Sequence, residues 1–331
     1  MKNPALRRVF LTSDQGRNRP YLLDALPRSQ RLAYLAQAKL FIKRTVVPSP
    51  TVKGARFPPP CRTLGLRELL KARPMAAKPT TPYHTLGKTV SLPGAELHSL
   101  LEGDPFKPLI ALIPMARHNF TMWEPLMADL LTHFRVLRFD IRGMGRSGAG
   151  DPDGYTFDHY ADDLAALLAH YDLGSAIVVG VAYGARTAAA FALRHPARLA
   201  GLALFDVSLR PPVDQGRQGV LGEAARAALT AVGQPPPKPQ RYWRFFEDRE
   251  SAAAVHRAHE GAPDLTEPLG AVQAPTLVAC GDYDENLKEA QRIAAWMPSA
   301  RFHLMPMTGH GSPLYRPAYV AALLAHHFSR G

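Results

Sequence analysis

The sequence lacks long hydrophobic runs and contains almost no cysteine. Its longest apolar stretches, such as residues 109–115, have the length of a β-strand and fall well short of the ~18 residues that a membrane-spanning helix needs. The only two cysteines, Cys61 and Cys280, lie far apart in the chain and suggest neither a disulfide framework nor a metal clip. We therefore expect a protein of the reducing cytoplasm with no membrane partner.

Acidic residues are scarce in the first 80 positions, where 17 lysines and arginines accompany only three acidic side chains. The rest of the chain holds 23 basic and 25 acidic residues, so the basicity belongs to this leader. Its proline clusters favour a weakly ordered extension over residues 1–85, and we do not expect nucleic acid as a partner. Residues 6–11 resemble an export signal without the required apolar segment, whereas a transit peptide and a native start at Met75 both stay open.

The pattern becomes regular from about Thr89, where β-rich runs alternate with stretches of helical periodicity. This alternation is typical of an α/β fold, a mostly parallel sheet with helices on both faces. We expect buried strands at residues 107–115, 134–140, 175–182, 199–207, 274–282 and 300–307, and helices at residues 122–134, 158–172, 185–195 and 287–297.

A stretch rich in proline and aromatic residues interrupts the alternation after the fourth of these strands. Residues 210–268 include GQPPPKPQRYWRFFEDRE, and we expect them to form a small helical cap above the sheet edge at which ligands bind. Residues 86–209 and 269–331 then form the core around the sheet.

Several motifs in one order resemble those of the α/β-hydrolase family. They are RGMGRS at residues 142–147, VVGVAYGART at residues 178–187, GDYD at residues 281–284 and TGHGSP at residues 308–313. The resemblance covers residues 89–329 and is to the capped branch that contains carboxylesterases and enol-lactone hydrolases. It implies a mostly parallel eight-stranded sheet and a small ester, lactone or apolar ligand as the partner. We expect no cofactor and no metal, since no ligand cluster or nucleotide-binding motif is visible.

The segment VVGVAYGART matches the turn that carries the family's nucleophile at all but one position. In the pattern G-x-S-x-G, small residues let the strand and the helix approach each other around a strained central residue. Gly180 and Gly184 supply the small residues, but Ala182 stands where the resemblance places serine. A methyl group cannot attack a carbonyl, which excludes acyl-enzyme chemistry through this position. Cys280, inside an expected strand, fits a core residue better than a relocated nucleophile.

The resemblance assigns the two other catalytic roles to His310 and Asp284. His310 lies beyond the last strand, where the family places its general base, and Asp284 lies where the family places the carboxylate that orients the base. Asp282 is a nearby alternative, but the family's spacing selects Asp284. The competing interpretation of Asp284 is a cap of the helix that begins near Asn286.

The expected oxyanion hole consists of the backbone N–H groups of Tyr183 and Ala116. The family's His-Gly pair falls on residues 114 and 115, which are proline and methionine here. Because backbone donors need no particular side chain, the hole can survive this change. The expected residues of the substrate pocket are Met115, Arg117 and Trp123. Arg117 is either a solvated loop residue or a clamp for an acidic substrate.

Three hypotheses about function follow from Ala182. The alanine is an engineered knock-out in an ester or lactone hydrolase, or it marks a natural hydrolase in which His310 acts directly on water or on a substrate proton. The third hypothesis is a binding protein without catalysis. The altered residues 114 and 115 favour natural divergence, because an engineer would change a single residue.

Overall fold

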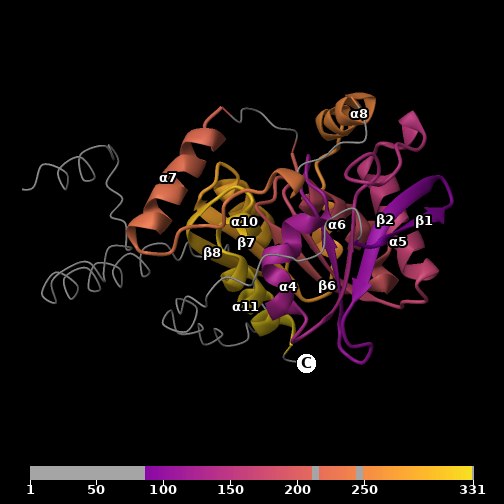
Figure 1. Cartoon of the computed structure of the whole chain (residues 1–331), viewed down its shortest axis with the longest axis horizontal. Coiled ribbons are helices and arrows are strands. Elements are labelled where there is room, and N and C mark those ends of the chain that lie inside the picture. The colour runs from indigo at the N-terminus through magenta and orange to yellow at the C-terminus, as the bar shows by residue number, and fades with distance from the viewer. Residues whose placement is uncertain (1–85, 211–215, 244–248, 330–331) are drawn as a thin grey trace, which may run out of the picture. The chain divides into compact units, whose positions relative to one another are not determined.

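An eight-stranded sheet organises the computed structural model, which describes residues 86–210, 216–243 and 249–329. The strands are β1 Lys88–Leu92, β2 Ala95–Glu102, β3 Leu109–Ile113, β4 Arg135–Phe139, β5 Ala176–Val181, β6 Leu199–Phe205, β7 Thr276–Tyr283 and β8 Ala300–Gly309. Their order across the sheet is β1-β2-β4-β3-β5-β6-β7-β8, with antiparallel pairing at β1, β2 and β4 and parallel pairing elsewhere (Figure 1). The mostly parallel sheet expected from the sequence is confirmed.

Helices cover both faces of this sheet. They are α4 Glu124–Leu130, α5 Phe157–His170, α6 Tyr183–Arg194, α7 Gln218–Ala231, α8 Arg249–Glu260, α9 Leu287–Trp296, α10 Ser312–Tyr315 and α11 Pro317–Phe328. The apolar sides of α4 and α11 pack in one cluster with every second side chain of β3 and β5. The helices α5, α6 and α9 pack in a second cluster with the other side chains of these two strands. Among the described helices, none is long and apolar enough to cross a bilayer.

Element boundaries differ from the expected ranges where proline and local hydrogen bonds intervene. The helix expected over residues 122–134 begins as a short 3₁₀ helix, Phe120–Trp123, which Asn119 caps by accepting from the N–H of Thr121, and α4 follows with Pro125 in its first turn. The α4 helix ends at Leu130. The hairpin of β1 and β2 was not among the expected strands, and its turn contains Gly94 with φ 77°.

The parallel strands β5, β6, β7 and β8 bring four loops to one edge of the sheet. Phe205, the last residue of β6, pairs with Val181 of β5 on one side and with Ala279 of β7 on the other, and Tyr283 of β7 pairs with Gly309 of β8. Because the strands run in the same direction, the residues that directly follow them become neighbours. In an α/β sheet this edge is where ligands bind.

The insertion between β6 and β7 contains α7 and α8. Figure 1 shows these two helices at separate places beyond the strands. Gly222 of α7 lies close to Gly309, since a Cβ built on Gly309 would be 3.3 Å from the Cα of Gly222. α8 contacts the start of α6, where the backbone oxygen of Val255 accepts a hydrogen bond from the Tyr183 hydroxyl at 3.2 Å. That residues 210–268 act as a cap stays a prediction. The leader, residues 1–85, lies outside the described residues.

Candidate active site

Ala182 occupies a strained turn between β5 and α6. Its φ of 53° and ψ of −110° are unusual for a residue with a side chain, and such a conformation costs on the order of 1–3 kcal/mol. The flanking glycines are needed for contact: a Cβ on Gly180 would lie 2.0 Å from the oxygen of Gly184, and one on Gly184 would lie 2.5 Å from the oxygen of Ile113. The strained elbow geometry is therefore present around a methyl group.

His310 and Asp284 meet at the ends of β8 and β7. The imidazole Nδ1 is 2.9 Å from Oδ2 of Asp284. The His310 side chain keeps 26% of its surface exposed, whereas that of Asp284 is fully buried. The other Asp284 oxygen accepts from Nε2 of Gln218 at 2.7 Å and from the N–H of Asn286 at 2.9 Å. The pair expected from the sequence is thus formed, and the carboxylate is held on both oxygens.

The two members of this pair stabilise each other's charge. Burial by itself lowers the pKa of His310, but the charge of Asp284 and its hydrogen bond outweigh burial and raise the pKa to about 9. For Asp284, burial raises the pKa, and the opposing charge and hydrogen bond of His310 bring it below its ordinary value. At neutral pH the pair is therefore an imidazolium and a carboxylate.

Asp206, which follows β6, anchors the loop that carries His310. One of its carboxylate oxygens accepts from the N–H groups of Gly311 at 3.0 Å and Ser312 at 2.6 Å, and the Ser312 hydroxyl donates to the carboxylate as well. Burial, together with the charge of Asp284, raises the pKa of Asp206. The sequence analysis missed this residue, although a carboxylate directly after the buried strand of residues 199–205 was a visible signal.

The loop after β3 lies against the first turn of α6 and against the His310 loop. A Cβ built on Gly184 would also lie 2.5 Å from the oxygen of Pro114, and one built on Gly311 would lie 3.3 Å from Sδ of Met115. The backbone of Ala116 therefore lies in a loop that contacts both neighbours. The predicted residues Met115 and Ala116 thus lie in a loop that contacts the turn of Ala182 and Tyr183 on one side and the loop of His310, with its partner Asp284, on the other.

Two of the predicted pocket residues behave differently. Arg117 is exposed and has a φ of 62°, a left-handed conformation that is uncommon for a residue with a side chain. Trp123 exposes no surface and belongs to the core cluster under α4 and α11, against which Met115 packs. Arg117 can thus meet a ligand from solvent, whereas Trp123 has no surface to offer one.

A model of the α/β hydrolase fold family matches residues 109–232. The chain is also 30% identical over 227 residues to the putative carbamate hydrolase RutD of Caulobacter sp. strain K31, an alignment that covers 62% of this chain and 84% of that protein. The chain belongs to the α/β-hydrolase family.

Solved structures agree with this membership. An enol-lactonase from Burkholderia xenovorans LB400 superposes with a TM-score of 0.60 and 25% identity, covering 73% of this chain and all of that one. A thermophilic esterase from Thermogutta terrifontis gives a TM-score of 0.59 and 26% identity over 72% of this chain and 97% of its own. In each comparison, about a quarter of this α/β hydrolase has no counterpart in the solved structure.

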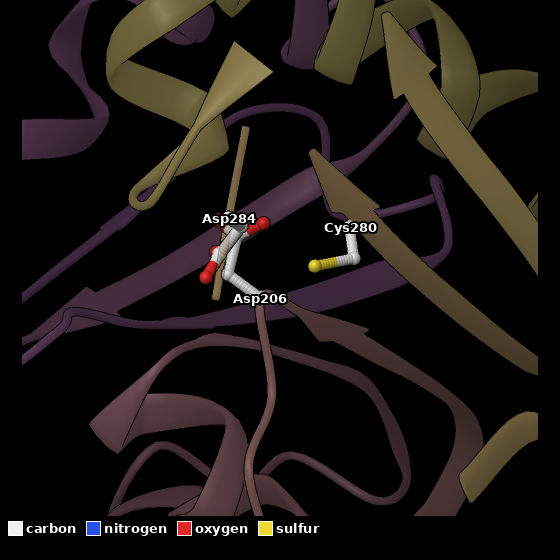
Figure 2. A group of neighbouring side chains, drawn as sticks. All are labelled: Asp206, Cys280 and Asp284. Carbon is white, nitrogen blue, oxygen red and sulfur yellow. The ribbon is translucent and has the colours of Figure 1, made fainter. Parts of the chain in front are cut away.

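Asp206, Cys280 and Asp284 form a buried group in which one donor atom of each lies within 4.8 Å of the others (Figure 2). In this α/β hydrolase, groups of the protein itself already form hydrogen bonds with both carboxylates. Hydrogen bonds from the loop after β8 occupy Asp206, and His310 and Gln218 occupy Asp284. Burial raises the pKa of the Cys280 thiol well above its ordinary value, so the sulfur stays protonated. The donor set therefore fits a hydrogen-bonded anchor better than a metal site.

Two further polar residues lie beside the elbow, and the sequence analysis missed both. Arg186, one turn into α6, exposes none of its surface. His259 of α8 has its ring 5.9 Å from that of Tyr183, and burial lowers its pKa to about 4, helped by the charge of Arg186. A single arginine inside the alanine-rich segment of residues 185–192 was a signal for the first. Nothing in the sequence distinguished His259 from His256, the other histidine of the insertion.

Proposed function

We propose that this α/β hydrolase cleaves small acyl compounds by direct attack of water, with His310 as the general base. The observation that carries the proposal is the His310–Asp284 pair, which is hydrogen-bonded at 2.9 Å although Ala182 offers no oxygen to activate. Without a serine hydroxyl at the elbow, a water molecule is the nucleophile that the imidazole can deprotonate.

The reaction balances without a covalent intermediate. His310, in its neutral form, takes a proton from water while the hydroxide oxygen forms a bond to the carbonyl carbon. The N–H groups of Tyr183 and Ala116 face the developing negative charge on the carbonyl oxygen. When the tetrahedral intermediate collapses, the bond to the leaving group breaks and the imidazolium returns the proton to it. Asp284 stabilises the imidazolium throughout and stays ionised.

The relatives support a substrate class. A putative carbamate hydrolase, an enol-lactonase and an esterase all act on a carbonyl carbon that carries a heteroatom leaving group. We therefore propose a small ester, lactone or carbamate as the substrate. The reducing cytoplasm stays our proposed location, because Cys280 is a free and buried thiol.

The proposal predicts an alkaline activity profile. A base must lose its proton before it can act, and the raised pKa of His310 keeps it protonated until the pH approaches about 9. Turnover should therefore increase as the pH rises from neutral and level off above about 9. A profile that is flat across this range would contradict His310 as the base.

Three forms of the full chain test the mechanism: the Ala182 protein, His310→Ala and Ala182→Ser. The substrates are p-nitrophenyl acetate, a γ-lactone and a phenyl carbamate. We expect the Ala182 protein to turn over at least one of them without a burst, and His310→Ala to lose on the order of 10²-fold in rate. Ala182→Ser should restore a burst of acyl-enzyme.

Other outcomes would reject the proposal in distinct ways. If only Ala182→Ser is active, Ala182 marks a lost or removed nucleophile rather than a water mechanism. If no form turns over any substrate, the binding-protein hypothesis replaces hydrolysis. A peptide map of the protein from its source that shows serine at position 182 would identify the alanine as engineered.

A further inference from the structure

A cavity of about 460 Å³ lies between the start of α5 and the last part of α8. Thirteen residues line it, namely Asp153, Tyr155, Thr156, Phe157, Asp158, Arg186, Ala254, Arg257, Ala258, Gly261, Ala262, Pro263 and Leu265. Ala182, His310 and Ala116 are absent from this lining, so the cavity is distinct from the elbow. The two sites are nevertheless close, because the N–H of Arg186 donates to the oxygen of Ala182 at 3.2 Å.

Arg186 lines this cavity as a buried cation without an anionic partner. It exposes none of its surface, and among the described residues no carboxylate forms an ion pair with it. Its terminal nitrogens donate to the backbone oxygens of Ser208, at 3.5 Å, and Pro263. Its Nε has no hydrogen-bond acceptor within the described part of the chain. The guanidinium lies 5.2 Å from the ring centre of Phe157.

Such a group is expensive to bury. Removing a charge from water costs several kcal/mol unless an opposite charge and hydrogen bonds replace the solvent. Burial lowers the pKa of Arg186, and the more distant charge of Asp264 only partly opposes that effect. Asp264 is itself engaged with Arg210 at 3.2 Å and Arg292 at 3.6 Å. An anion in the cavity would supply the missing partner.

The other lining residues indicate which class of anion the cavity binds. Phe157, Ala262 and Leu265 provide apolar walls. Asp153 and Asp158, both exposed, place two negative charges in the lining, and the exposed Arg257 places one positive charge there. A carboxylate group matches the planar fork of a guanidinium, and a single negative charge meets less repulsion from these aspartates than a phosphate does. We propose that this cavity binds a small monocarboxylate with an apolar body, whose carboxylate pairs with Arg186.

Pro263 is the lining residue whose backbone oxygen contacts the Arg186 guanidinium. The guanidinium is covered, and its contact with the Pro263 oxygen is the one that a carboxylate oxygen replaces. Pro263 is itself exposed and lies in a loop after α8, so this exchange moves a surface segment and leaves the sheet unchanged. The inference concerns binding alone and does not rest on the proposed hydrolysis.

Isothermal titration calorimetry on the full chain tests the proposal with three probes: phenylacetate, its neutral analogue phenylacetamide, and inorganic phosphate. We expect phenylacetate to bind at least about tenfold more tightly than either of the others. Arg186→Gln should lose at least about tenfold in phenylacetate affinity, and Arg186→Lys should recover part of it, because lysine restores the charge without the fork.

Two further variants control for folding and for general charge. Ala258→Phe keeps Arg186 and fills the cavity from α8, and it should also abolish phenylacetate binding. Arg257→Gln removes an exposed charge of the lining and should change affinity less than about threefold. The proposal is wrong if Arg186→Gln or Ala258→Phe binds phenylacetate as the unaltered chain does, if phosphate or the amide binds as tightly, or if Arg257→Gln has the same effect as Arg186→Gln.

Discussion

Arg142 and Arg186 are both buried, yet their surroundings differ in one respect. Arg142, in the loop after β4, donates from Nε and Nη2 to the two oxygens of Asp163 on α5, at 3.1 Å and 2.7 Å. Arg186, under α8, donates to backbone oxygens, and the residues that the structure describes provide no such carboxylate for it. Arg142 thus forms a complete internal ion pair. Arg186 is a buried cation for which the described residues supply no carboxylate.

The two histidines near the elbow show the same contrast. Asp284 accompanies His310, and its charge overcomes burial and raises the pKa to about 9. For His259, burial and the positive charge of Arg186 lower the pKa to about 4. At neutral pH one imidazole is charged and the other is neutral. The strand ends therefore carry paired charges, whereas the region under α8 carries a positive charge for which the described residues supply no carboxylate.

The largest expected effect separates the two arginines by stability. Arg142→Met leaves the buried carboxylate of Asp163 without a partner and should cost about 3–5 kcal/mol of unfolding free energy. Arg186→Met removes a cation that has no carboxylate partner among the described residues, together with its hydrogen bonds to two backbone oxygens, so it should stay within about 1 kcal/mol of the unaltered chain. Urea unfolding of both variants measures this. Equal losses would show that Arg186 is as well compensated as Arg142.

The next effect tests the charge of the His310 pair. Asp284→Asn keeps the shape and removes the charge that overcomes burial, so the pKa of His310 should fall well below about 9 and turnover should drop by on the order of 10²-fold. An NMR titration of the imidazole measures the pKa. The matched control is Asp282→Asn, two residues earlier at the same strand end, which should leave the His310 titration in place.

A smaller effect concerns the anchor of the His310 loop. Asp206→Asn replaces an oxygen that accepts from Gly311 and Ser312 by an amide, and it should cost about 1–3 kcal/mol in thermal or urea unfolding. Because the charge of Asp206 contributes to the raised pKa of His310, that pKa should also decrease slightly. Loss of stability with an unchanged His310 titration would limit Asp206 to a purely structural role.

The smallest effect is at the elbow itself. Ala182→Gly removes the side chain from a conformation with φ 53°, and the relief of strain should raise the unfolding free energy by about 1 kcal/mol. Ala185→Gly, three residues later inside α6, is the control and should destabilise by about as much. If both substitutions destabilise equally, the elbow stores no strain.

Much of the fold and part of the site could be predicted because they depend on local patterns. Alternating strands and helices specify a parallel sheet, and the spacing around Gly180 and Gly184 identifies the elbow before any contact is known. His310 and Asp284 were assigned through the motifs GDYD and TGHGSP of the family resemblance, and the structure places the two side chains in contact. The ends of α4 and the pairing of β1 with β2 could not be predicted, since capping by Asn119 and the pairing of the hairpin outweigh the hydrophobic periodicity of the sequence.

By itself the sequence determined that acyl-enzyme chemistry is impossible at position 182, because no fold can make a methyl group nucleophilic. Only the tertiary structure decided which charges are paired. Asp206, Arg186 and His259 are distant in the sequence, and their roles depend on what burial places beside them. Asp206 lies beside the amides of Gly311 and Ser312, whereas Nε of Arg186 finds no acceptor among the described residues. Electrostatic energy in a protein interior depends on neighbours in space, and a linear pattern does not contain them.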